Sequence, residues 1–181
     1  MRRQGKEPFN FLLQYDPADI PKLAAEYMAT FAEADREMET AGRRIASGDF
    51  SRTNLEVIYR WKSARRIGLL ANNTDSTIAQ ALQRATSARD VREAVLLLMR
   101  LEGVGVKMAS AILTAIDPER YTVLDVRALE ALGMENSEDI DLYVLYVEAC
   151  REMARKYGVK MRDLDRRRIL SKPPTTGPTT E

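Results

Sequence analysis

Apolar residues recur along most of the chain at alternating steps of three and four, which is the spacing of one buried helical face. The clearest stripe begins at Ile20 and continues through Ala24, Tyr27, Phe31, Ala34, Met38, Ala41 and Ile45. Asp16-Pro17 supplies a cap and a first-turn proline, and Ser47-Gly48-Asp49 supplies a stop. This pattern favours a helix packed in a bundle over a free coiled coil, because it lasts only about three to four heptads.

Further helices are predicted from the same spacing. They cover 54–66, 75–85, 91–101, 107–116, 125–132 and 140–157, with residues 72–75 and 87–90 as caps. Residues 121–124 alternate like a strand but are bounded too tightly to propose a sheet. We therefore predict an all-α fold, with one helical domain over 1–170 and a disordered tail over 171–181, which is rich in Pro and Thr.

The composition is that of a soluble globular protein, with 45% hydrophobic and 30% charged residues among 181. No stretch approaches the roughly 20 consecutive apolar residues that span a bilayer, so we expect no membrane contact. The basic residues at 1–6 lead into no signal-type apolar segment. We expect a cytoplasmic monomer, associated with the nucleoid if the source is prokaryotic.

Two residue types restrict the chemistry. The chain has no histidine and one cysteine, Cys150. Ser-His-Asp triads, Cys-His dyads and histidine-ligated metals are therefore excluded, and a lone cysteine provides no intrachain disulfide or cysteine-ligated cluster. We expect no metal or cofactor, and any chemistry must use Lys, Asp, Glu, Tyr, Ser or the backbone.

The net charge of +1 hides an uneven distribution. Basic residues gather in two patches, which are Arg52, Arg60, Lys62, Arg65 and Arg66, and then Lys160, Arg162, Arg166, Arg167, Arg168 and Lys172. Acidic residues concentrate at 26–39 and 135–141. This distribution is compatible with one nucleic-acid face, although solvated helix faces are the alternative that charge alone favours.

The most informative stretch is Leu101-Glu102-Gly103-Val104-Gly105-Val106-Lys107, between two apolar helical segments. Alternate glycines predict a tight turn with positive φ, and the amides that open the next helix would favour an anion such as a DNA phosphate. The segment 91–116 resembles the helix-hairpin-helix module of nonspecific DNA binders. A purely structural hairpin is the alternative, since glycine also ends helices. The expected DNA contacts in the turn are Gly103, Val104, Gly105 and Val106.

The longer segment 97–132, about a fifth of the chain, resembles the helix-hairpin-helix-GPD superfamily of base-excision DNA glycosylases, which includes endonuclease III and 8-oxoguanine glycosylase. In that superfamily a Leu-Pro-Gly-Val-Gly-x-Lys hairpin precedes an essential aspartate. Here Asp125 follows Lys107 by 18 residues, the spacing of endonuclease III-like members. The resemblance implies a monomeric enzyme that flips and excises a modified base from double-stranded DNA.

The resemblance also assigns two catalytic roles. Lys107 matches the amine that attacks the sugar C1′, expels the base and forms a Schiff base for strand cleavage by β-elimination. Asp125 matches the carboxylate that assists this nucleophile and stabilises positive charge on the sugar. Glu102 stands at the usual proline position, Arg127 stands where histidine is frequent, and the four-cysteine motif is absent, so a cluster-free enzyme is expected. A catalytically silent DNA-binding protein is the alternative function.

The second half of the site is predicted from composition alone. Tyr59, Trp61 and Asn72 are candidates for contact with a flipped base, because aromatic rings stack on bases and a turn asparagine can enter the gap in the duplex. The basic candidates for DNA contact are Lys62, Arg65, Arg66 and Arg127. A core position for Trp61 and an ordinary turn at Asn72 are the alternatives, and the identity of the base stays open.

Overall fold

The computed structural model describes residues 11–12, 16–22, 24 and 33–164. All regular secondary structure in these residues is helical, which confirms the predicted all-α class. None of the described helices is both long and apolar enough to cross a membrane. The predicted tail at 171–181 lies outside the described residues, as does part of the first apolar stripe, at 25–32.

The helices follow one another with short connections. In chain order they are η1 (Pro17–Asp19), α2 (Glu33–Ala46), α3 (Arg52–Ser63), η2 (Ala64–Arg66), α4 (Ile67–Leu70), α5 (Asp75–Thr86), α6 (Val91–Leu98), α7 (Val106–Ile116), α8 (Val126–Ala131), α9 (Ile140–Tyr157) and α10 (Met161–Leu164). The bounds of α9 are those predicted. The predicted helix at 54–66 is wrong at its end, because α3 stops at Ser63, whose φ of −165° leaves the helical region.

Side-chain caps fix where several helices begin. Thr74 accepts the Thr77 N–H at 3.1 Å at the start of α5. Asp90 accepts the Glu93 N–H at 2.8 Å at the start of α6. Since these caps satisfy amides that have no partner within the helix, the predicted starts of α5 and α6 are confirmed.

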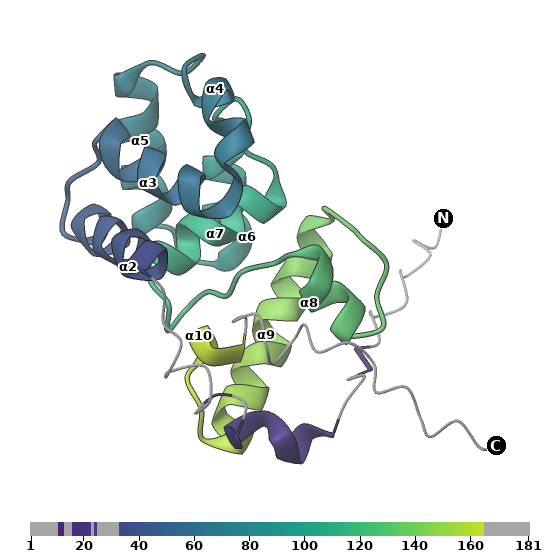
Figure 1. The fold of residues 1–181 in the computed structure, drawn as a ribbon. Coiled ribbons are helices and arrows are strands. Elements are labelled where there is room, and N and C mark those ends of the chain that lie inside the picture. Colours follow the sequence, from purple (N-terminus) through teal and green to yellow (C-terminus); the bar gives the residue numbers. More distant parts are fainter. Residues whose placement is uncertain (1–10, 13–15, 23, 25–32, 165–181) are drawn as a thin grey trace, which may run out of the picture.

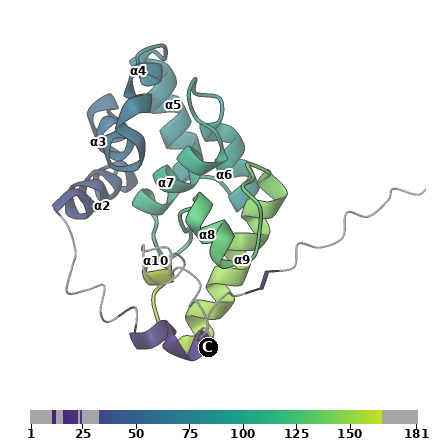
Figure 2. The ribbon, with the colours of Figure 1, turned by 45° about the vertical axis from the view of Figure 1, so that its right-hand side comes forward.

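Figure 1 shows two groups of helices. Helices α2–α7 form one group, and α8–α10 with η1 form the other; the turned view agrees (Figure 2). The segment between α7 and α8 runs from the first group to the second. Helix α6 packs against α9, and Arg92 of α6 forms an ion pair with Asp141 of α9. One apolar core includes residues of both groups, such as Leu98 and Tyr146.

Helix α7 lies at the centre of the packing. It contacts α2, α3, α5 and α6, and each of its residues except Lys107 is buried. A helix that is apolar on all sides must be enclosed by neighbours. Lys107, in the first turn of α7, is half-buried, so it is the one charged residue of this helix and lies where the helix reaches the surface.

The predicted C-terminal basic patch is wrong at Arg162. This residue is 6% exposed and its guanidinium lies 3.6 Å from the Asp35 carboxylate of α2. Asp35 also accepts the indole N–H of Trp61 at 2.9 Å. Because a buried cation needs a partner, Arg162 serves as a link between α10 and α2 and not as a surface charge.

Candidate functional site

The turn between α6 and α7 is anchored by apolar side chains and shaped by one glycine. Leu101 and Val104 are buried, and the Val104 N–H donates to the Leu101 carbonyl at 3.1 Å. Gly103 has a φ of +84°, and a Cβ there would lie 2.6 Å from the Leu69 Cβ. Glycine is therefore required at Gly103 for both its backbone conformation and its close contact with α4.

Gly105 differs from the prediction. Its φ is −97°, so the expected positive φ is wrong at this residue, which is instead the extended N-cap of α7. Glycine provides no side-chain cap, so the N-cap residue forms no side-chain hydrogen bond to the first amides of α7. A Cβ at Gly105 would collide with the carboxylate of Glu138. An acidic side chain therefore lies against the helix end where a phosphate was expected.

Gly105 and Lys107 are both approached by the segment that joins α8 to α9, which carries Asn136 and Glu138. The Lys107 ammonium donates to the side-chain oxygen of Asn136, which is exposed. Residues 133–139 thus cover the start of α7 from the second group of helices. The amine is held at the junction of the two groups.

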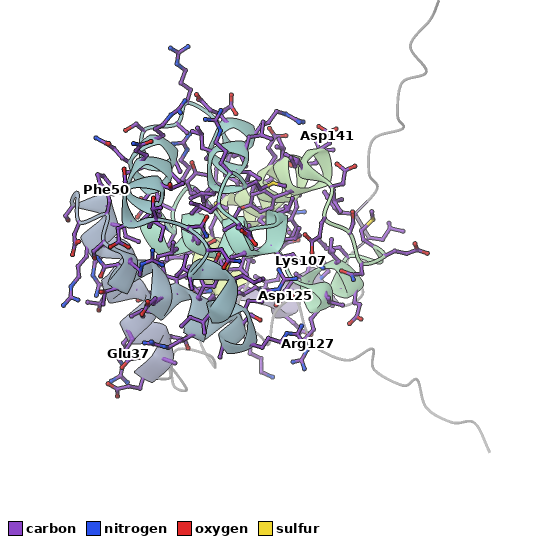
Figure 3. The ribbon with its side chains drawn as sticks, turned by 90° about the horizontal axis from the view of Figure 1, so that it is seen from above. Glu37, Phe50, Lys107, Asp125, Arg127 and Asp141 are labelled. Atoms are coloured by element: carbon purple, nitrogen blue, oxygen red, sulfur yellow. The ribbon has the colours of Figure 1, made fainter. Side chains whose placement is uncertain are left out.

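Asp125 is the N-cap of α8. Its Oδ1 accepts the Ala128 N–H at 2.8 Å, and Oδ2 takes no hydrogen bond from the described residues. In the view of Figure 3, Lys107, Asp125 and Arg127 are drawn on the side of the molecule away from Glu37 and Phe50. The cap fixes the orientation of the carboxylate and leaves one oxygen for chemistry.

Ser110 joins the backbone of Lys107 to that of Leu124, the residue before Asp125. Its hydroxyl donates to the Lys107 carbonyl at 2.8 Å and accepts the Leu124 N–H at 2.9 Å. One fully buried hydroxyl therefore bridges the first turn of α7 and the residue before Asp125. The backbone of Lys107 therefore lies close to the segment that leads into Asp125.

Asn72 lies beside the α6–α7 turn. Its amide donates to the Glu102 carboxylate at 2.7 Å. The adjacent Asn73 is 8% exposed and forms two hydrogen bonds with the backbone of Glu102, donating to its carbonyl at 3.1 Å and accepting its N–H at 2.8 Å. The turn before α5 and the turn before α7 are therefore one connected surface.

Two of the predicted base contacts face the core. Tyr59 is 0% exposed, and burial raises the pKa of its hydroxyl to about 12. The expected stacking of a base on Tyr59 is wrong, since no ring face is accessible. Trp61 is half-buried, with Asp35 bound to its indole N–H and Arg162 over its ring. The core position that the sequence left open for Trp61 is the one observed.

The predicted basic contacts differ in their surroundings. Arg65 and Arg127 are exposed and form no ion pair with the described residues, whereas Lys62 and Arg66 are half-buried. Arg52, which belongs to the predicted basic patch at 52–66, is bound within the protein: it forms an ion pair with Asp75 and donates to the Leu70 carbonyl at 3.0 Å. Arg52 therefore fixes the turn before α5 and does not belong to an open cationic face.

Sequence reasoning missed three residues of this site, which are Ser110, Asn136 and Glu138. Ser110 had a usable signal, because a serine in an apolar helix must find a partner. No sequence pattern marks Asn136 or Glu138 as a site residue, because their contacts with α7 depend on how the second group of helices packs against the first.

No group of three or more described His, Cys, Asp or Glu side chains is arranged to hold a metal ion. Cys150 is buried. A cavity of about 800 Å³ lies near the opposite end of α7, lined by residues that include Ala115, Arg151 and Met161. This cavity is separate from the site at Lys107.

Comparison with known proteins identifies no relative: no protein-family model, curated protein or solved structure matches the chain significantly.

Proposed function

We propose that the chain is a DNA glycosylase of the helix-hairpin-helix-GPD type that excises a modified base from duplex DNA and cleaves the strand as an AP lyase. The observation that carries the proposal is the Ser110 bridge, which ties the backbone of Lys107 to that of Leu124, the residue before Asp125. Amine and carboxylate are the two groups that this reaction requires, and neither a metal nor histidine is needed.

The proposed reaction begins with Lys107 as a neutral amine, its proton having passed to the Asp125 carboxylate. The amine attacks C1′, and the C1′–N bond breaks as the base leaves with the electron pair and takes up a proton. The attacking nitrogen then loses a proton, which passes to O4′ as the C1′–O4′ bond breaks, and its electron pair forms the C=N bond of a protonated Schiff base between Nζ and C1′. Loss of a proton from C2′ and departure of the 3′ phosphate complete β-elimination.

The start of α7 supports a role in phosphate binding. Gly103 and Gly105 place no side chains on this turn, and the N-cap of α7 makes no side-chain hydrogen bond to the first amides of the helix. Such a helix end favours an anion through its free N–H groups and its dipole. The carboxylates of Glu102 and Glu138 lie beside it and oppose binding, so the DNA must displace the segment that carries Glu138.

The test is a panel of duplexes that each carry one altered base, scored separately for base release and for strand scission. We expect release of at least one altered base by the parent protein, with scission on the same duplex and none on undamaged DNA. A Lys107→Gln variant should bind the same duplexes and lose scission.

Tight binding of the duplexes without any base release would contradict the proposal. That result would favour the alternative function, a catalytically silent DNA-binding protein, which needs only the turn between α6 and α7 to bind DNA. Absence of binding to every duplex would remove DNA as the partner.

A further inference from the structure

Two tyrosines of α9 hold the segment that leads into Asp125. Tyr143 donates its hydroxyl to the Thr122 carbonyl at 3.0 Å, and Tyr146 donates to the Val123 carbonyl at 3.2 Å. Both tyrosines are 0% exposed. The segment is extended and pairs with no strand among the described residues, so side chains satisfy backbone groups that a sheet would otherwise satisfy.

The third hydroxyl comes from α7. Ser110 accepts the N–H of Leu124, the residue that directly precedes Asp125, and donates to the Lys107 carbonyl. Two successive peptide groups are thus bound by side-chain hydroxyls. The 122–123 group is bound at its carbonyl from α9, and the 123–124 group is bound at its carbonyl from α9 and at its N–H from α7.

We infer that Ser110, Tyr143 and Tyr146, here called the hydroxyl clamp, are positioning residues for the glycosylase reaction. The clamp holds Asp125 at a fixed place relative to Lys107, because it ties the intervening segment to both groups of helices. The inference rests on the proposed function. None of the three side chains touches the substrate; each acts through Asp125.

The rate of the proposed reaction depends strongly on the relative position of Lys107 and Asp125. A misplacement of about 1 Å can lower a reaction rate by about 10²-fold, because the reacting groups lose their alignment. The Asp125 carboxylate is oriented by its own cap on α8, but that cap does not fix α8 relative to α7. The clamp supplies this second constraint.

The test uses Ser110→Ala and the double variant Tyr143→Phe/Tyr146→Phe, each of which removes only hydroxyl oxygen. Single-turnover base release should fall about 10–100-fold in each, while the dissociation constant for the duplex stays within about twofold. Ser110→Thr keeps the hydroxyl and should recover most of the rate. Should Ser110→Ala fail to fold, the double tyrosine variant carries the same test.

The matched control is Tyr121→Phe. Tyr121 is 2% exposed and lies in the same segment, but its hydroxyl has no hydrogen-bond partner among the described residues. Removing this oxygen leaves the backbone bonds of the segment in place. The rate should therefore stay at the parental value.

A double-mutant cycle separates positioning from general stability. Ser110→Ala should lower the rate in the parent but have little further effect in an Asp125→Asn background, because the clamp acts through that carboxylate. An equal loss in both backgrounds would overturn the inference, as would clamp variants that react at the parental rate. A parent protein that neither releases a base nor traps abasic DNA would instead overturn the proposed function, and the role of the clamp with it.

Discussion

Arg162 lies over the ring of Trp61, with its guanidinium carbon 5.3 Å from the ring centroid. Asp35 joins the same cluster, because it accepts the indole N–H at 2.9 Å and lies 3.6 Å from the guanidinium. Three helices, α2, α3 and α10, therefore meet at one buried cation.

Replacing Arg162 with methionine should lower the free energy of unfolding by about 3 kcal/mol, since the Asp35 carboxylate is then buried without its cation. Urea denaturation measures this loss. The control is Arg155→Met on the exposed face of α9, which should change stability by about 0.5 kcal/mol or less. Equal stabilities for the two variants would show that the cluster contributes nothing to the fold.

The sequence predicts the helices well where a cap and an apolar stripe coincide, as at the starts of α5 and α6. It does not predict the burial of Arg162, because the charge pattern along α10 is that of a surface and the partner lies more than a hundred residues earlier. The end of α3 was misplaced for a similar reason: residues 64–66 have helical composition, and their 3₁₀ conformation depends on tertiary packing.

The candidate site was predictable in part. Lys107 and Asp125 are predicted from a motif and its spacing, and the Ser110 bridge ties the backbone of Lys107 to the residue before Asp125. The contacts of Asn136 and Glu138 with the start of α7 were not predictable. These two residues lie in the connection between α8 and α9, whose position depends on how α9 packs against α6. A local pattern reports the helix on which a residue lies, whereas the contacts of a loop depend on the whole fold.

Gly103→Ala should destabilise the protein by about 2 kcal/mol and weaken DNA binding. The cost has two sources, a positive φ and a Cβ placed 2.6 Å from the Leu69 Cβ. Gly48→Ala is the matched control, because Gly48 has a φ of +99° and open space around its Cβ position. Thermal melts should show a larger loss at Gly103. If both variants lose the same stability, contact with Leu69 is not a constraint on the turn.

Glu138→Gln should raise the affinity for duplex DNA about two- to fivefold. Its carboxylate lies against the N-cap of α7, and removing one negative charge beside a phosphate site relieves a repulsion of about 0.5–1 kcal/mol. Fluorescence anisotropy at fixed salt measures the change. The exposed Glu152 of α9 provides the control, and Glu152→Gln should bind as the parent does. Parental affinity in Glu138→Gln would mean that DNA binds elsewhere.

Asp125→Asn should lower base release by about 10²–10³-fold with little loss of stability. Asparagine caps a helix as well as aspartate does, so the substitution removes the charge and keeps the start of α8. Asp90→Asn makes the same exchange at the cap of α6 and should leave base release unchanged. Single-turnover assays compare the two. Base release by Asp125→Asn at the parental rate would remove this carboxylate from the mechanism.

Borohydride trapping on an abasic duplex tests most directly whether the Lys107 amine bonds to the sugar. Reduction of the Schiff base fixes the protein to the DNA, and mass mapping of the digested adduct identifies the modified lysine. We predict an adduct on Lys107, no trapping by Lys107→Gln, and parental trapping by Lys160→Gln, which alters an exposed lysine beyond α9. Trapping at the parental rate by Lys107→Gln, or an adduct mapped to another lysine such as Lys62, would contradict the account.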